Sequence, residues 1–359
     1  MQGFELNFFL GGLSPIGFQG YYARSLPPAG AGRAVLIKAG PGCGKSHLMR
    51  ALAQRLTAAG HTVHTIHCSA DPASLDGVIC PALTLTVLDA TAPHALEPAF
   101  PQAHETVLSL YVALQEEKLR CHCAELQALN AKYKAITGRA SRYLAAAGSL
   151  LQDRARTAQC CTDLAKARAF ALSLSKRYLP VKKERQPQEA HRTLSAVTAD
   201  GVMFYHQTVR TLCREIIILD DAYGPASGAL LAQLRKEILA KGYGLITCWC
   251  AMQPREKIDH LLVPELGLAF VTSGPFHRFE PMGDRVIHAA RFMNKNGLGA
   301  RKARLKFDLR AAKELVQEAG ALLGEARSTH RQIEAFYTSA MDFSKADAAL
   351  ENLCASLGL

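Results

Sequence analysis

Apolar residues follow two different spacings in the first hundred residues. A short apolar run at residues 34–37 predicts a strand, and a segment with helical spacing follows it after a glycine-rich turn. The apolar positions of that helix are Leu48, Met49, Leu52 and Leu56. Gly60 follows as a helix cap, and residues 62–68 and 83–88 predict two more strands. Strands that alternate with helices in this way favour an α/β fold with a parallel sheet.

The same pattern occurs twice in the chain. Residues 215–275 follow residues 34–93 at an offset of 182 or 183 positions. The matching pairs include Gly42 with Gly224, Leu48 with Leu230, Gly60 with Gly242, Cys68 with Cys250, Asp76 with Asp259, and His94 with His277. Self-similarity of this kind indicates a tandem duplication. We predict two domains, at residues 1–180 and 193–359, joined by an exposed linker at residues 181–192.

Each copy ends in a segment with helical composition. Residues 105–178 are rich in Ala, Leu, Gln, Lys and Arg, which predicts two or three long helices. Residues 309–357 form the corresponding stretch of the second copy, with one apolar helical face made by Leu315, Ala319, Leu322 and Leu323. We interpret both segments as packing elements, with a lid or a partner-binding arm as the alternatives.

The turn between the first strand and the first helix carries the clearest chemical pattern. Its residues are Ala39, Gly40, Pro41, Gly42, Cys43, Gly44, Lys45 and Ser46, followed by His47. A glycine-rich turn ending in Lys-Ser between a strand and a helix is the Walker A pattern, with Ala39 where the strictest form has glycine. Glycines let backbone N–H groups face an anion, and the helix N-terminus adds its dipole. We predict that residues 40–47 bind ATP, that Lys45 contacts its β- and γ-phosphates, and that Ser46 helps to coordinate Mg²⁺.

A phosphate loop also needs a carboxylate at the end of a neighbouring strand to hold Mg²⁺. Asp89 follows the third predicted strand, whereas Asp220 and Asp221 follow an apolar run at residues 216–219. Because the repeat aligns the latter pair with the loop of the first copy, we favour Asp89 as the catalytic and Mg²⁺-binding carboxylate. Asp220 with Asp221 is the alternative, and Asp76 is a further candidate.

The loop of the second copy lacks the Walker A chemistry. The residues in place of Gly44, Lys45 and Ser46 are Ala226, Ser227 and Gly228. Asp220 and Asp221 also bring negative charge to the place where phosphates would lie, and like charges disfavour a bound nucleotide. We therefore expect one working nucleotide site and one degenerate site.

With the repeat and the loop together, the chain resembles an uncharacterised family of bacterial tandem P-loop ATPases. The matching residues are Gly11, Gly12, Ser14, Gly17, Phe18, Gly40, Pro41, Gly42, Gly44, Lys45, Ser46, His67, Cys68, Asp71, Ser74, Leu75, Asp76, Asp89, Thr91, Ala92, Pro93 and His94. The similarity covers most of the chain. It implies two tandem P-loop NTPase-like domains, each followed by a helical hairpin or arm, and ATP as the ligand. In that family the second half also has a glycine-rich loop ending in Gly-Lys-Ser or Gly-Lys-Thr, and this sequence departs from it there.

Composition limits the class of protein more than its function. Of the 359 residues 49% are apolar and 20% are charged, which is typical of a globular chain. No apolar run approaches the ~20 residues that cross a bilayer, and the first twelve residues lack a signal peptide, which predicts a cytoplasmic protein. We expect the eleven cysteines to be reduced, because the chain is long and apolar and lacks a signal peptide. Their close pairs lack the spacing of zinc sites, which disfavours metal binding.

The net charge of +11 permits a polyanionic partner without requiring one. The densest basic cluster consists of Lys295, Arg301, Lys302, Arg304 and Lys306. Without interleaved aromatic residues we interpret it as a solvated surface, and a nucleotide-dependent nucleic-acid contact is the alternative. Mg²⁺-dependent ATP hydrolysis is the leading function. A kinase that uses His67, Asp71 and Asp76 to bind a small-molecule or nucleoside acceptor is the alternative enzyme.

Overall fold

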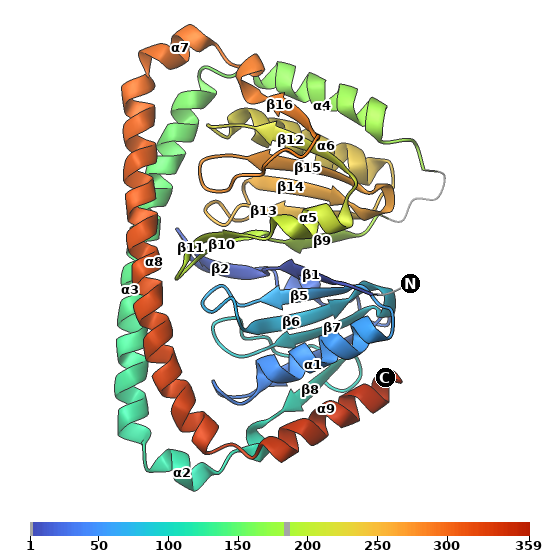
Figure 1. Cartoon of the computed structure of the whole chain (residues 1–359), viewed down its shortest axis with the longest axis vertical. Helices are drawn as coiled ribbons and strands as arrows, with labels where there is room; N and C mark the ends of the chain where they lie inside the picture. The colour runs from blue at the N-terminus through green and yellow to red at the C-terminus, as the bar shows by residue number, and fades with distance from the viewer. Residues whose placement is uncertain (1–2, 183–186) are drawn as a thin grey trace.

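Two six-stranded sheets form the body of the protein, one in each copy of the repeat (Figure 1). The computed structural model describes residues 3–182 and 187–359. The strand order of the first sheet is β1, β5, β6, β7, β4, β8, and that of the second is β9, β13, β14, β15, β12, β16. The two orders correspond strand for strand, as a duplication predicts. Within the described residues, no helix is both long and apolar enough to span a membrane.

The strands of both sheets are short and mostly buried. The first sheet contains β1 (Glu5–Phe8), β4 (Arg33–Lys38), β5 (Val63–His67), β6 (Leu75–Cys80), β7 (Leu85–Asp89) and β8 (Glu105–Ser109). The second contains β9 (Glu189–Arg192), β12 (Glu215–Asp220), β13 (Leu245–Trp249), β14 (Ile258–Val263), β15 (Leu268–Ser273) and β16 (Arg285–His288). Each copy adds a hairpin, β2 (Gly11–Ser14) with β3 (Gly17–Gly20), or β10 (Ser195–Thr198) with β11 (Gly201–Phe204).

Both sheets are mixed, which corrects the prediction of a parallel sheet. β6 runs antiparallel to β5 and β7, and β14 runs antiparallel to β13 and β15, whereas the other neighbours are parallel. The reason lies in the short turns η2 (Pro81–Leu83) and η4 (Pro264–Leu266), since three residues cannot form the crossover that parallel strands need. The predicted strand at residues 83–88 therefore begins two residues later, at Leu85.

One helix in each copy covers a face of its own sheet. α1 (Lys45–Ala58) buries Leu48, Met49, Leu52 and Leu56, the positions that its apolar spacing predicts. α6 (Pro225–Ala240) buries the matching face of the second copy, with Leu230 and Leu234. Shorter helices in the connections are η1 (Ala23–Ser25), η3 (Tyr111–Ala113), η5 (Ala289–Phe292) and α5 (His206–Leu212).

The helical arms of the two copies pack together as one long antiparallel helix pair beside both sheets (Figure 1). Its elements are α2 (Glu116–Arg120), α3 (Cys123–Gln159), α7 (Lys295–Ala300) and α8 (Lys302–Ser339). Arg304 pairs with Asp153 near one end of this helix pair, and the ring of His330 lies against that of Tyr133 nearer the other end. The segment predicted as wholly helical from residue 105 begins instead with the strand β8, which pairs with β4 as the last strand of the sheet.

The last helix of each arm packs on the other copy. α4 (Leu164–Tyr178) buries Ala167, Ala171 and Leu174 in the core of the second sheet with α6. α9 (Phe343–Leu357) buries Leu350 and Leu353 in the core of the first sheet with α1. The helices thus exchange partners between the copies.

The two sheets also share a core. Phe8 and Ile66 of the first copy and Ile216 and Val271 of the second belong to one buried apolar cluster. The second sheet already begins at β9, inside the range predicted as linker, of which residues 183–186 lie outside the described residues. The range 193–359 therefore leaves β9 out of the second domain, and the division at residues 180 and 193 does not separate the packed units.

Candidate functional site

The glycine-rich turn of the first copy joins β4 to the N-terminus of α1. Gly42 and Gly44 have φ angles of 70° and 80°, a left-handed conformation that residues with a side chain rarely adopt. Gly44 is the residue before the helix, so Lys45 and Ser46 occupy its first turn. The backbone therefore provides the bend and the helix N-terminus of an anion-binding loop.

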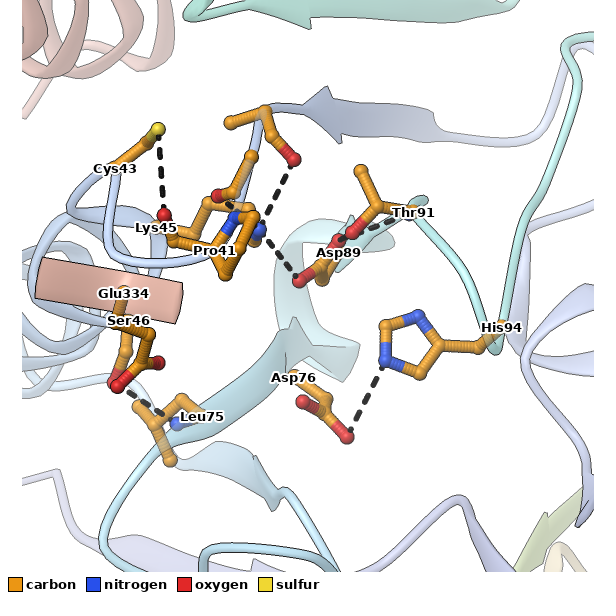
Figure 2. A network of polar contacts seen from close by, with 12 residues as sticks. Pro41, Cys43, Lys45, Ser46, Leu75, Asp76, Asp89, Thr91, His94 and Glu334 are labelled. Carbon is orange, nitrogen blue, oxygen red and sulfur yellow. Dashed lines mark hydrogen bonds and ion pairs between the residues drawn. The ribbon is translucent and has the colours of Figure 1, made fainter. Parts of the chain in front are cut away.

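Lys45 and Asp89 meet at the end of the sheet, as Figure 2 shows. The Lys45 Nζ atom lies 3.4 Å from Asp89 Oδ2, and both side chains are nearly buried, 13% and 10% exposed. Lys45 also donates to the carbonyl oxygens of Gly40 (2.8 Å) and Ala39 (3.2 Å). The other carboxylate oxygen of Asp89 accepts hydrogen bonds from the N–H and hydroxyl groups of Thr91.

This meeting follows from the strand order. β7 lies directly beside β4 and parallel to it, so Asp89 at the end of β7 lies at the same sheet edge as the loop that follows β4. β12, which ends at Asp220 and is followed by Asp221, belongs to the other sheet. Of the two carboxylate positions weighed from the sequence, the structure brings Asp89 to Lys45.

Ser46 lies next to the first residue of β6. Its Oγ atom accepts a hydrogen bond of 2.9 Å from the N–H of Leu75. The next residue, Asp76, is buried, so the α1 N-terminus and β6 bring a second carboxylate to the site. Asp76, Asp89 and His94 each offer a ligand atom, and these atoms lie within 4.8 Å of one another.

Asp76 belongs to a small buried network. Tyr22 donates its hydroxyl to Asp76 Oδ2 at 2.9 Å, and His94 Nε2 lies 3.7 Å from the same oxygen. Burial acts to lower the pKa of His94, but the nearby carboxylates of Asp76 and Asp89 raise it overall. Burial and the charge of Asp76 raise the pKa of Tyr22, so its hydroxyl keeps the proton that it donates.

The far end of α8 covers the loop. Thr338 Oγ1 donates to the carbonyl of Gly42 at 3.2 Å, and a Cβ atom at Gly40 would come within 2.6 Å of the Tyr337 ring. Glu334 lies beside the loop as well (Figure 2). A hydrogen bond from His330 lowers the pKa of Glu334 against the effect of burial, and the charges of Arg331 and Lys45 lower it further.

The remaining predicted residues lie around this centre. Cys43 is buried, and burial raises the pKa of its thiol, whereas Pro41 is half-buried and His47 is exposed on α1. The residues of the kinase alternative have partners of their own. Asp71 lies 3.7 Å from Arg331, and the ring nitrogens of His67 contact Asn7 and the Pro72 carbonyl.

The predicted basic cluster lies at the α7 end of the long helix pair, away from the loop of the first copy (Figure 1). Two of its members have partners there. Arg304 pairs with Asp153, and Arg301 donates to the Gly297 carbonyl.

The loop of the second copy is filled by its own carboxylate. Asp221 Oδ1 accepts hydrogen bonds from the N–H groups of Tyr223 and Gly224, both at 2.9 Å. Asp221 Oδ2 accepts another from the N–H of Ser227 at 2.8 Å, and the residue is 5% exposed. Asp220 is exposed and pairs with His288. The predicted negative charge of this loop thus comes chiefly from Asp221, which occupies the backbone donors itself.

The two copies also differ on the strands beside the loop. β-sheet register places Thr272 where the first copy has Asp89, and Asp259 where it has Asp76. Lys257 Nζ lies 2.7 Å from Asp259 Oδ1, and the charge of this ammonium, against the effect of burial, holds the pKa of Asp259 well below its usual range. The second copy has therefore exchanged one carboxylate for a hydroxyl and gained an internal cation.

Comparison with protein-family models, curated proteins and solved structures finds no match.

Sequence reasoning missed three members of the site. His94 was recognised as a position that the repeat retains and that fits the resembled family, but it was given no role. In the structure its ring lies beside Asp76. Tyr22 carried no motif. Glu334 and its neighbours on α8 lie almost 300 positions along the chain from the loop, and no local pattern connects them.

Proposed function

We propose that the chain binds ATP at residues 40–47 and hydrolyses it with Mg²⁺ at the first copy alone. The observation that carries this proposal is the position of Lys45, which lies in the first turn of α1 after a left-handed glycine and 3.4 Å from Asp89. A fixed ammonium at a helix N-terminus, with a carboxylate at the adjacent strand end, is the arrangement that phosphoryl transfer from a nucleoside triphosphate requires.

The residues of the site divide the work between them. Lys45 would exchange the carbonyls of Ala39 and Gly40 for phosphate oxygens and stabilise the charge that develops on them. Ser46 and Asp89 are the groups that would hold Mg²⁺, with Asp76 beside them. The bound cation would neutralise negative charge on the phosphates.

The second copy would bind no nucleotide in this scheme. Asp221 already occupies backbone donors of its loop, and Ser227 stands in place of the lysine. The same difference supplies a matched control, because Lys45 and Ser227 are equivalent positions in two copies of one fold.

The test is ATP binding measured by calorimetry on the full chain with Mg²⁺, followed by phosphate release with ATP alone. We expect Lys45→Ala to abolish binding, Ser227→Ala to leave it unchanged, and Asp89→Asn to slow phosphate release by about 100-fold or more. Circular dichroism confirms that each variant is folded. Loss of binding in Ser227→Ala, with binding retained in Lys45→Ala, would overturn the proposal. Turnover only with an added acceptor would show a kinase instead.

A further inference from the structure

Three side chains from separate parts of the first copy meet beside Lys45. Asp76 lies on β6, Asp89 ends β7, and His94 follows the turn after β7 (Figure 2). Their ligand atoms lie within 4.8 Å of one another. Ligand distances of about 2.1 Å place opposite donors of an octahedral cation about 4.2 Å apart. Small side-chain adjustments would therefore be enough to enclose a cation.

The group is buried and incompletely paired. The side chains of Asp76 and His94 are 8% and 6% exposed, and His94 Nδ1 is buried without a hydrogen-bond partner among the described residues. His94 Nε2 lies 3.7 Å from Asp76, which is too far for a good hydrogen bond. Two carboxylates and an imidazole that are buried together with a poorly paired nitrogen favour a cation between them.

The second copy supplies an internal comparison. It retains Asp259 and His277, the equivalents of Asp76 and His94. Lys257 immediately precedes β14 and places its ammonium 2.7 Å from Asp259, whereas the first copy has the short Ser74 at that position. In the second copy, therefore, a cationic side chain lies beside the aspartate that is equivalent to Asp76.

In the second copy a side chain also takes the place of the anion that a phosphate loop would bind. Asp221 stands where the first copy has Ala39, and its carboxylate accepts three N–H groups of the loop and of α6. In the second copy the Lys257 ammonium thus stands in for a bound cation, and the Asp221 carboxylate stands in for an anion bound to the loop. The first copy has Ser74 and Ala39 at these two positions, so a cation and an anion from solution would take the places of the two charged groups.

We propose that Asp76, Asp89 and His94 bind a divalent cation of the Mn²⁺ class, in the place that the Lys257 ammonium takes in the second copy. Two carboxylates with one imidazole suit Mn²⁺ or Fe²⁺ better than Mg²⁺, which prefers oxygen ligands alone. The site deepens the proposed function and rests on it for its place beside Lys45: Asp89 and Asp76 would hold a Mn²⁺-class ion where the proposed function has Mg²⁺, with His94 as the ligand that selects it. It does not depend on a nucleotide for its ligands.

The test uses Mn²⁺ alone, titrated into the full chain without nucleotide and followed by electron paramagnetic resonance. We expect one bound ion with a histidine nitrogen coupling in its spin-echo spectrum. Loss of an outer partner of a metal ligand already costs about 10–100-fold in affinity, so Asp76→Asn and His94→Phe should each weaken binding by at least about tenfold. His277→Phe is the matched control in the second copy, with affinity and coupling unchanged.

Each other outcome overturns the cation site. Absence of bound Mn²⁺, a bound ion without nitrogen coupling, or a coupling that survives His94→Phe would do so. If His94→Phe fails to fold, the wild-type spectrum and the affinity of Asp76→Asn decide between the same outcomes. Mn²⁺ binding in a protein that does not bind ATP would leave this site standing and refute the proposed function alone.

Discussion

Replacement of Asp221 by alanine tests whether a carboxylate holds the loop of the second copy together. The change removes three hydrogen bonds, of 2.8 to 2.9 Å, from the N–H groups of Tyr223, Gly224 and Ser227. An unpaired buried donor costs about 1–3 kcal/mol, and water can reach part of this loop, so we expect a loss of about 3–5 kcal/mol in the free energy of unfolding. The α6 N-terminus also loses a favourable negative charge, which acts in the same direction.

The assay is urea unfolding of both proteins, followed by circular dichroism. Asp220→Ala is the control one residue away, because that side chain is exposed, pairs with an exposed His288 and should cost at most about 1 kcal/mol. Sulfate should stabilise Asp221→Ala more than the wild type, since it can occupy the vacated donors. If Asp221→Ala cost no more than Asp220→Ala and sulfate had no selective effect, the reasoning would be refuted.

Two further predictions follow from buried groups. Burial lowers the pKa of His64 and His260 to about 3, against about 6.5 in an unfolded chain. Between these two pH values the unfolded state binds more protons than the folded state. The free energy of unfolding therefore falls as the pH falls, by about 1.4 kcal/mol per pH unit for each histidine. Urea unfolding between pH 4 and 7 should show one histidine's share of this slope missing in His64→Leu, and equal slopes would contradict it. Leu350→Ala on α9 should cost about 2–5 kcal/mol and weaken protection of α1 amides in hydrogen exchange more than that of α6. Equal loss of protection in both helices would show that α9 does not stabilise the first copy selectively.

Local patterns predicted the parts of the fold whose partners lie close in the sequence. The spacing of Leu48, Leu52 and Leu56 predicted α1 and its buried face, and the repeat predicted that a second sheet would follow. β6 was missed because Asp76 and Gly77 interrupt its apolar run, although they lie on a strand buried on both faces. The exchange of α4 and α9 was not predictable, since helical spacing shows that a face is buried but not what covers it.

The site shows the same limit. The loop residues were predicted because their motif spans a single strand, turn and helix, and Asp89 was predicted because it ends a neighbouring strand. Strand order then brought them together. Asp221 was interpreted as a repelling charge or, with Asp220, as the alternative Mg²⁺-binding pair, and not as a partner of its own loop. Its three hydrogen bonds depend on the orientation of N–H groups, which no pattern of residue types specifies.

The partner exchange of α4 and α9 has a consequence for the origin of the chain. Each sheet depends on the other copy for a covering helix, so a half-length polypeptide would leave its core partly open. Two half-length chains could close both cores by swapping these helices, which makes a domain-swapped homodimer the natural precursor of the fused protein. After fusion the two loops are encoded separately, so one copy can carry Lys45 while the other carries Ser227.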